Sequence, residues 1–395
     1  MHLTKRSKPF IIPEYSLTGD LFSYLSCGLQ YRYHNKGSLP PSIPVQLWFG
    51  QFIHSVMEEA YIKWKEENKK AFPWEWNPDI REIEMDIYQR LQVTGLSAPL
   101  NLFCPYDSET TSSRFCKDDN HPHKLIASIR AELAINMWGK HLFPLIDEAE
   151  IKLKGSRKIP SELKNISRSK YYGIKGVIDV ISSFSMRNID QDNLIIDYLL
   201  KNQDLIKHIR ELDSHEYEII IDYKGMTRPS TESESWKHHE WQILTYSWLR
   251  SKQPDSKKVI AGIIFYINEL DPSSENLIEF KEDIRKKTTD IIPEGNDLEA
   301  IKKWRISKKV PQLSDAFKEE RSIRIIPITP NKINYALQKF EEIVGEIEMC
   351  VYLETSGRGI TSSWRYNPIE RNCTVCDFKT FCPNPSPKKY SPTVP

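Results

Sequence analysis

The sequence lacks a long apolar run and an export signal. No stretch of about 18 uncharged apolar residues occurs, so no transmembrane helix is expected. The N-terminal residues MHLTKRSKPFIIPEYS are basic but contain no long hydrophobic region, which argues against a signal peptide. We therefore expect a cytoplasmic protein without a membrane partner.

The sequence also has little net charge. Its 55 Lys and Arg residues nearly balance 54 Asp and Glu residues, which gives a formal charge of +1. A uniformly basic nucleic-acid-binding surface is excluded, so any such surface must be local. Residues 301–325 contain eight basic and three acidic residues. This region is either a solvated helical face or part of a surface that contacts phosphate groups.

Several common catalytic motifs are absent. The sequence contains no G-x-x-x-x-G-K-[ST] loop, so it carries no recognisable ATP-driven motor. It also contains no G-x-S-x-G, H-E-x-x-H or G-x-G-x-x-G motif. If the protein works with a motor, we expect that motor to be another polypeptide.

The hydrophobic pattern predicts an α/β fold. Helical periodicity favours helices over residues 14–35 and 45–66, and β-branched and apolar segments later in the chain favour strands. The expected strands are 149–154, 171–184, 217–224 and 258–268, with a helix over 235–251. Consecutive strands with one crossover helix indicate a sheet covered by helices.

The pattern divides the chain into six segments. Between two N-terminal helices and the strands lies a mostly helical insertion, and a helical, locally basic segment follows the strands. A cysteine-containing segment and a proline-rich, disordered tail complete the chain. The expected boundaries are 1–66, 67–147, 148–270, 271–350, 351–383 and 384–395.

Two acidic residues occupy otherwise apolar strands. Gly176-Val177-Ile178-Asp179 and Ile221-Asp222-Tyr223-Lys224 each place a carboxylate where burial costs several kcal/mol unless a partner compensates it. Mg²⁺ or Mn²⁺ compensates such carboxylates. Asp222 and Lys224 are two residues apart and therefore share a strand face. This pairing suits metal-assisted hydrolysis, although a D-x-K triplet alone is also typical of a surface salt bridge.

Three further side chains extend this pattern. His54 lies on the apolar helix before the strands, where a histidine is either a core residue or a metal ligand. Gln242 and Tyr246 are four residues apart on the helix after Lys224, so they share a face. Both can donate hydrogen bonds to phosphate or accept one from the lysine.

The cysteines suggest a metal or iron–sulfur site. Cys373-x2-Cys376-x5-Cys382 is a tight cluster, and Cys27 supplies a fourth thiolate. Four thiolates suit a 4Fe–4S cluster or structural zinc. Closing a loop between the chain ends costs entropy only logarithmically, so a site that joins them is feasible.

In this order, the motifs resemble the RecB-type nucleases of the PD-(D/E)xK superfamily. The resemblance is to the iron–sulfur branch, which includes the AddB nuclease domain and the CRISPR-associated exonucleases. It rests on Cys27, Gly50-x3-His54, the two acidic motifs, Gln242-x3-Tyr246 and the C-terminal cysteines, and it covers about half of the chain. It implies a restriction-endonuclease-like core, a mixed central sheet flanked by helices, with helical insertions and an iron–sulfur staple.

The resemblance also implies roles for these residues. His54, Asp179, Asp222 and the carbonyl group of Tyr223 would hold Mg²⁺ or Mn²⁺, and Lys224 would orient or activate the water. Gln242 and Tyr246 would support the lysine or the nucleic acid. Cys27, Cys373, Cys376 and Cys382 would bind a 4Fe–4S cluster. A further carboxylate is often present in this superfamily; its candidates here are Glu58, Glu148 and Glu150.

The implied function is a metal-dependent DNA nuclease, an exonuclease on single-stranded ends, in DNA repair, CRISPR adaptation or anti-phage defence. A separate helicase, integrase or defence-complex subunit would be its partner. The alternatives are a catalytically degenerate nucleic-acid-binding subunit and a zinc-stapled scaffold in which Asp222 and Lys224 form only a salt bridge.

Overall fold

The computed structural model describes residues 12–37, 45–106, 123–369, 372–373 and 376–383. The predicted tail over residues 384–395 lies outside the described residues. No helix in the described part of the chain has the length and apolar character needed to cross a membrane.

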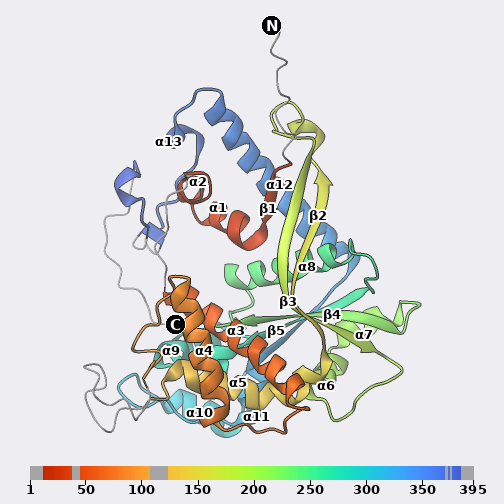
Figure 1. Ribbon diagram of the computed structural model, residues 1–395, viewed down its shortest axis with the longest axis vertical. Coiled ribbons are helices and arrows are strands. Elements are labelled where there is room, and N and C mark those ends of the chain that lie inside the picture. Colours follow the sequence, from red (N-terminus) through yellow and green to blue (C-terminus); the bar gives the residue numbers. More distant parts are fainter. Residues whose placement is uncertain (1–11, 38–44, 107–122, 370–371, 374–375, 384–395) are drawn as a thin grey trace.

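A six-stranded mixed sheet forms the centre of the molecule (Figure 1). Its strand order is β1-β3-β4-β5-β6, and β2 pairs with the opposite edge of β3. The β1–β3 and β4–β5 pairs are parallel, and the β2–β3, β3–β4 and β5–β6 pairs are antiparallel. The strands are β1 (Glu14–Ser16), β2 (Ile146–Lys158), β3 (Tyr171–Ser185), β4 (Glu216–Lys224), β5 (Val259–Tyr266) and β6 (Ile323–Pro327).

Helices cover both faces of the sheet. Before β2 lie α1 (Ser23–Ser26), α2 (Gly28–Gly37), α3 (Val45–Glu66), α4 (Arg81–Val93) and α5 (Ile126–Leu142). Between β3 and β5 lie α6 (Leu194–Lys201), α7 (Gln203–Arg210) and α8 (Glu234–Arg250). The remaining helices are α9 (Ser274–Lys286), α10 (Gly295–Lys303), α11 (Asp315–Ser322), α12 (Pro330–Thr355) and α13 (Ile360–Ser363).

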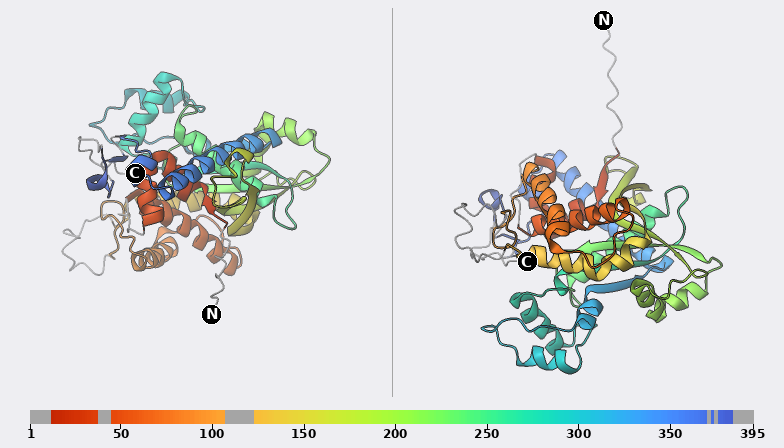
Figure 2. Two further views of the ribbon diagram at one scale, coloured as in Figure 1. Left: turned by 90° about the horizontal axis from the view of Figure 1, so that it is seen from above. Right: turned by 60° about the horizontal axis from the view of Figure 1, so that its bottom comes forward.

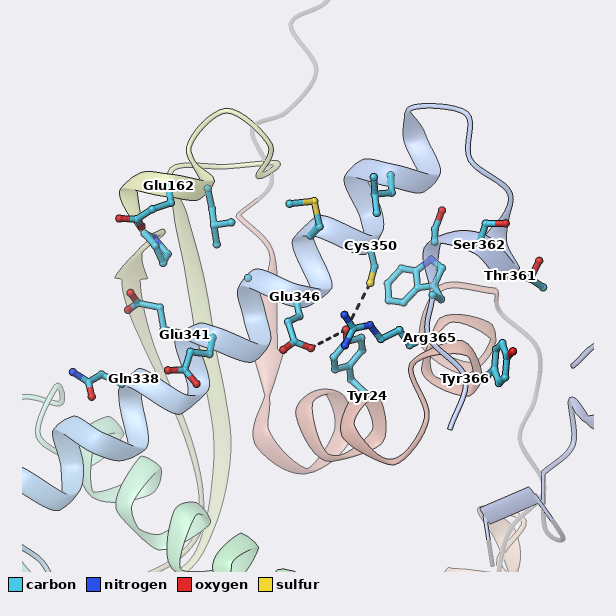
Figure 3. Close-up of a pocket in the computed structure, with 18 residues that line it drawn as sticks. Tyr24, Glu162, Gln338, Glu341, Glu346, Cys350, Thr361, Ser362, Arg365 and Tyr366 are labelled. Carbon is cyan, nitrogen blue, oxygen red and sulfur yellow. Dashed lines mark hydrogen bonds between the residues drawn. The ribbon is translucent and has the colours of Figure 1, made fainter. Parts of the chain in front are cut away.

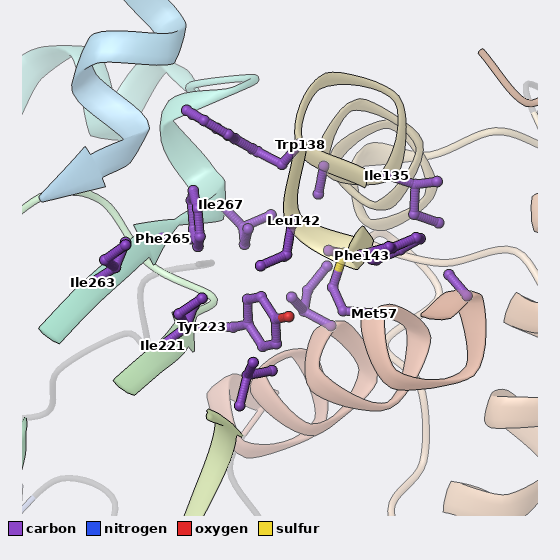
Figure 4. Packing of buried hydrophobic residues seen from close by; sticks show 14 of the residues in the cluster. Met57, Ile135, Trp138, Leu142, Phe143, Ile221, Tyr223, Ile263, Phe265 and Ile267 are labelled. Atoms are coloured by element: carbon purple, nitrogen blue, oxygen red, sulfur yellow. The ribbon is translucent and has the colours of Figure 1, made fainter. Parts of the chain in front are cut away.

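The core consists of two large clusters on opposite faces of the sheet. On one face α3 and α5 pack against β4 and β5, with Met57 and Trp138 facing Tyr223 and Phe265 (Figure 4). On the other face α8 and α12 bury Trp241 and Phe340. A third, smaller cluster joins α9, α10 and α11, which protrude from the sheet (Figure 2). The sheet is therefore protected on both sides, as its continuous apolar strands require.

These observations confirm the predicted α/β class with a mixed central sheet flanked by helices. The helix predicted over 45–66 is α3, and the predicted crossover helix is α8, which joins the parallel strands β4 and β5. The Ser233 side chain accepts a hydrogen bond from the Trp236 N–H and so begins α8 with an N-cap.

Two local predictions were wrong. Residues 14–35 do not form one helix, because Glu14–Ser16 is a strand that pairs with β3 and Cys27 has extended dihedral angles between α1 and α2. The strand predicted over residues 149–154 is confirmed as part of the longer β2, whereas α6 and α7, between β3 and β4, were not predicted. The segment 271–350 contains β6, a five-residue edge strand paired with β5.

Candidate active site

Asp179 and Asp222 meet where two central strands separate. The pairing of β3 with β4 ends at Val180 opposite Ile221, so Asp179 and Asp222 would be the next opposed pair. Both side chains are buried, at 8% and 2% exposure. His54 of α3 contacts Asp179, and Gln242 of α8 contacts Asp222.

Asp179 is held from two directions. Its Oδ2 accepts a hydrogen bond from the Tyr223 backbone N–H at 2.9 Å and lies 3.1 Å from Nδ1 of His54 on α3. Burial alone would raise the pKa of Asp179, but His54 and Lys224 outweigh burial and hold it below its usual value. Burial lowers the pKa of His54, whereas Asp179 and Asp222 raise it, and the result is about 9.

Asp222 is less well compensated. Its Oδ2 lies 2.6 Å from Nζ of Lys224, and its Oδ1 accepts a hydrogen bond from Nε2 of Gln242 at 3.1 Å. Burial raises the pKa of Asp222; Lys224 lowers it and Asp179 raises it again, so the net shift is upward. Apart from the ion pair with Lys224, Asp222 Oδ2 accepts no hydrogen bond from the described residues. A buried carboxylate oxygen in this state is suited to bind a cation.

A chain of hydrogen bonds from α8 positions Lys224. Its Nζ donates to Oε1 of Gln242 at 2.9 Å, and Nε2 of Gln242 donates to the Tyr246 hydroxyl at 3.1 Å. The Tyr246 ring packs against Gly176, where a Cβ atom would lie only 2.6 Å from Cε1 of Tyr246. The glycine of the G-x-x-D motif therefore lets α8 approach β3 closely.

A third carboxylate, Glu150 of β2, joins Asp179 and His54. One ligand atom from each of the three residues lies within 4.8 Å of the others. Glu150 has a φ of +51°, a left-handed conformation that is uncommon within a strand. Burial raises the pKa of Glu150, and Asp179 and Glu58 raise it further, to about 7. Perturbed pKa values of this kind cluster at functional sites.

The structure separates the three candidate carboxylates that the sequence left unranked. Glu148 makes an ion pair with Arg250, 3.1 Å away, on the far end of α8. Glu58 is half-buried, and burial together with Glu59 raises its pKa, with a further contribution from Asp179. Glu150 is the one within the His54–Asp179 group. In the sequence, the alternation Glu150-Ile151-Lys152-Leu153-Lys154 indicates a strand that includes Glu150. It does not show which residue of the neighbouring strand lies opposite Glu150.

The donor set fits Mg²⁺ or Mn²⁺. Carboxylate oxygens with an imidazole suit these hard ions, and the partly unsatisfied Asp222 Oδ2 lies beside them. Asp179, Asp222, His54 and Glu150 would hold such an ion. The ligand roles of individual residues, including the Tyr223 carbonyl group, stay predictions.

The four predicted cluster cysteines also come together. Cys27, at the end of α1, and Cys373, Cys376 and Cys382 line one small cavity and form no disulfide. Burial raises the pKa of the Cys376 thiol, and the other three sulfur atoms raise it further. Asn372 fixes this segment to α1, because its Nδ2 donates to the Ser26 hydroxyl at 2.8 Å.

A large groove lies away from these residues, and most of its charged side chains are acidic. A groove of about 1050 Å³ runs along α12 towards the tip of the β2–β3 hairpin (Figure 3). Glu162, Glu341, Glu342 and Glu346 line it. These carboxylates outnumber Arg365, the basic residue of the same lining, and repel phosphate groups, which disfavours this groove as a nucleic-acid surface.

Not all of the basic side chains in residues 301–325 lie at the surface. Arg321 and Arg324 are buried and bind Glu269 and Asp290 with shortest distances of 2.7 Å each. These two arginines stabilise the interior and are not available to phosphate. The prediction that the whole stretch forms one solvated or phosphate-contacting face is wrong for them.

Comparison with known families agrees with this geometry. The model of the PD-(D/E)XK nuclease superfamily matches residues 202–383, so this part of the chain is similar to a PD-(D/E)XK nuclease superfamily domain. The matched residues include Asp222, Lys224, Gln242 and Tyr246, whereas His54, Glu150 and Asp179 lie before them. A domain of this superfamily indicates a metal-dependent phosphodiester hydrolase acting on nucleic acid. No curated protein matches the chain.

Proposed function

We propose that the protein is a divalent-metal-dependent deoxyribonuclease that degrades single-stranded DNA from its ends. The observation that carries this proposal is the single buried network of Asp179, Asp222, Lys224 and His54 at the point where β3 and β4 separate. The exonuclease assignment and the single-stranded substrate rest on the resemblance to iron–sulfur nucleases.

The residues would divide the work as follows. Mg²⁺ or Mn²⁺, when bound, supplies a water of lowered pKa and neutralises charge on the phosphate group. Lys224 orients the attacking water and stabilises the anionic transition state through its ammonium group. Gln242 fixes the direction of Lys224, because its Oε1 accepts from Nζ while its Nε2 donates to Asp222. His54 restrains Asp179 within reach of the same position.

A nuclease assay tests this function directly. End-labelled single- and double-stranded DNA is incubated with protein purified without oxygen, in Mg²⁺, Mn²⁺ or EDTA. We expect metal-dependent cleavage of the single strand, its loss in Lys224→Ala, and its retention in Lys257→Ala, which removes an exposed lysine at the other end of the sheet. The product ladder distinguishes terminal from internal cleavage. Metal-independent cleavage, or an active Lys224→Ala variant, would contradict the proposal.

A catalytically degenerate binding subunit is the second candidate. Such a protein would bind DNA without cleaving it under any metal condition, and Lys224→Ala would bind DNA as the wild type does. The presence of both acids, the lysine and Gln242 in hydrogen-bonding positions favours the active enzyme.

We further propose that Cys27, Cys373, Cys376 and Cys382 bind a 4Fe–4S cluster that joins the two ends of the chain. Support comes from their shared cavity and from the number of thiolates, which suits such a cluster. Iron and zinc analysis of anaerobically purified protein tests it, with Cys350→Ser as a control for thiol loss elsewhere. About four iron atoms per chain, lost in Cys376→Ser, are expected; zinc in their place would contradict it.

The nuclease would act with a separate helicase, integrase or defence-complex subunit in DNA repair, CRISPR adaptation or anti-phage defence. This part of the proposal follows from the resemblance and from the absence of a P-loop in the sequence. Co-purification of the tagged protein from its native host tests it.

A further inference from the structure

Part of the β3 edge next to the candidate active site has no strand partner. β1 pairs with residues 173–175 of β3, and β4 pairs with residues 180–185 on the same edge. On this edge no strand that the structure describes pairs with residues 176–179, whereas β2 pairs with residues 176–178 on the opposite edge. A pocket of about 490 Å³ lies along this uncovered edge, which ends at Asp179.

Three exposed lysines line this pocket on one face of the β2–β3 hairpin. Lys152 is opposite Val177, and Lys154 is opposite Lys175. Residues opposed across antiparallel strands share a face, as do residues two apart along one strand. The four side chains therefore share one face of the hairpin; the pocket that they line, here called the lysine groove, also includes Ser16 and Tyr246.

The lysine groove leads directly to the candidate active site. Two residues further along the same strands lie Glu150 on β2 and Asp179 on β3, where the left-handed φ of Glu150 interrupts the regular alternation. At about 3.3 Å per residue, Lys152 lies about 7 Å and Lys175 about 13 Å along the strands from that acidic pair. Tyr246 connects the groove with the candidate active site. It lines the groove and accepts a hydrogen bond from Gln242, which contacts Asp222 and Lys224.

The charges of the groove are available to a ligand. Lys154 makes one ion pair, with Glu14 at 3.0 Å, and both partners are exposed to solvent. Lys152 and Lys175 make no ion pair with any described residue. Val177 between them is 37% exposed and offers an apolar surface to a sugar or base. The groove on α12 has the opposite charge, so this hairpin face is the one that attracts phosphate groups.

We propose that the lysine groove binds the phosphate backbone of a single nucleic-acid strand whose scissile bond lies at Asp179 and Asp222. This inference rests on the proposed function and adds the path of the substrate to it. Lys152 and Lys175 contact successive parts of the backbone, and Val177 packs against the nucleotide between them. A backbone-tracking basic surface binds strands of any sequence.

Binding in the absence of metal tests the groove separately from catalysis. The probe is a fluorescein-labelled oligo(dT) of about 20 nucleotides, longer than a typical single-strand site, measured by fluorescence anisotropy in EDTA. The variants are Lys152→Ala/Lys175→Ala and its matched control Lys201→Ala/Lys207→Ala, which removes two exposed lysines from α6 and α7. Both variants lower the net charge by two, so a difference in Kd between them is due to the positions of the lysines and not to their number.

We expect the groove variant to raise the Kd roughly ten-fold at about 100 mM salt and to reduce the slope of log Kd against log salt by about 1.4, since each lost phosphate contact contributes about 0.7. The control should bind like the wild type. A groove variant with unchanged Kd and slope, or a control that weakens binding equally, would overturn the inference.

Cleavage by the wild type and its loss in Lys224→Ala are measured on the same preparations. If the wild type binds but does not cleave, the proposed function fails while the binding comparison still decides the groove. If the wild type cleaves and the groove variant binds normally, the groove fails and the nuclease assignment stands.

Discussion

Two groups of interacting charges in this protein differ in how completely they are balanced. In the first, Arg228, Arg321 and Arg324 surround Asp290 and Glu269 with bidentate ion pairs. In the second, the candidate active site, Lys224 and His54 face Asp179, Asp222, Glu150 and Glu58. Cations outnumber carboxylates in the first group, and carboxylates outnumber cations in the second.

The titration behaviour follows this balance. Burial alone would raise the pKa of Asp290, but Arg228 and Arg324 outweigh it and hold the pKa far below its usual value. At the active site the same burial is not overcome, so the pKa of Asp222 is raised and that of Glu150 reaches about 7. A carboxylate that stabilises the fold is neutralised by cationic side chains of the protein. A carboxylate that is to hold a metal has too few cationic side chains around it to balance its charge.

Exchanging one carboxylate for an amide at the active site should give the largest effect. Asp222→Asn keeps the shape of the side chain but removes the negative charge that would hold the metal. We expect cleavage to fall roughly 10³-fold, the scale of losing a main electrostatic contact to the transition state. Steady-state assays with Mg²⁺ and a thermal-shift titration measure it. Cleavage at the wild-type rate by this variant would show that the excess of carboxylates at the site has no role in catalysis.

The equivalent change in the balanced group should act on stability instead. Asp290→Asn leaves the buried Arg228 and Arg324 with one fewer carboxylate, which should lower the free energy of unfolding by about 1–3 kcal/mol. Urea denaturation measures this, with Asp222→Asn as the comparison. We expect the metal-free Asp222→Asn variant to lose less stability than Asp290→Asn. The reverse order would contradict the distinction between the two groups.

Metal affinity should depend on pH, because the excess of carboxylates at the site raises the pKa values of groups that would bind the metal. The raised pKa values of Glu150, about 7, and His54, about 9, mean that protons occupy sites a metal needs. Affinity for Mn²⁺ should therefore rise from pH 6 to 9, with protons released on binding. Calorimetry in buffers of different ionisation enthalpy measures both. Glu150→Gln should weaken binding about ten-fold and reduce proton release near pH 7; a pH-independent affinity would argue against these ligands.

The smallest expected effect concerns the support of Lys224. Tyr246→Phe removes the hydroxyl that accepts from Gln242 but leaves the bonds from Gln242 to Asp222 and Lys224 in place. One neutral hydrogen bond contributes about 1 kcal/mol, so kcat should fall about five-fold. Gln242→Ala breaks all three contacts, so the kcat of this variant should fall further. Equal losses in both variants would show that Tyr246 acts on the substrate and not through Gln242.

The sequence predicted those parts of the fold where the hydrophobic pattern is strong. The apolar strands β3, β4 and β5 and the helices α3 and α8 are long and periodic, so their positions were right to within a few residues. β1 and β6 are short edge strands that depend on pairing with β3 and β5, and their own sequences gave no strand signal. Local propensity is overridden by such tertiary pairing.

The site was predictable to a similar extent. Asp222, Lys224, Gln242 and Tyr246 follow from spacing on a single strand and a single helix, and the structure brings them into contact. Glu150 could not be ranked above Glu58 and Glu148, because its proximity to Asp179 depends on the register between β2 and β3. Likewise, nothing in the composition of residues 301–325 shows that two of the arginines are interior.

The separation of β3 and β4 beyond Val180 and Ile221 makes the chemistry sensitive to the length of the chain. Inserting one residue within either strand would turn one carboxylate to the opposite face while leaving the sheet able to pair. The connection between the strands, which carries α6 and α7 and does not enter the site, should accept extra residues at far lower cost. Lineages of this protein should therefore differ in length between β3 and β4 but not within them.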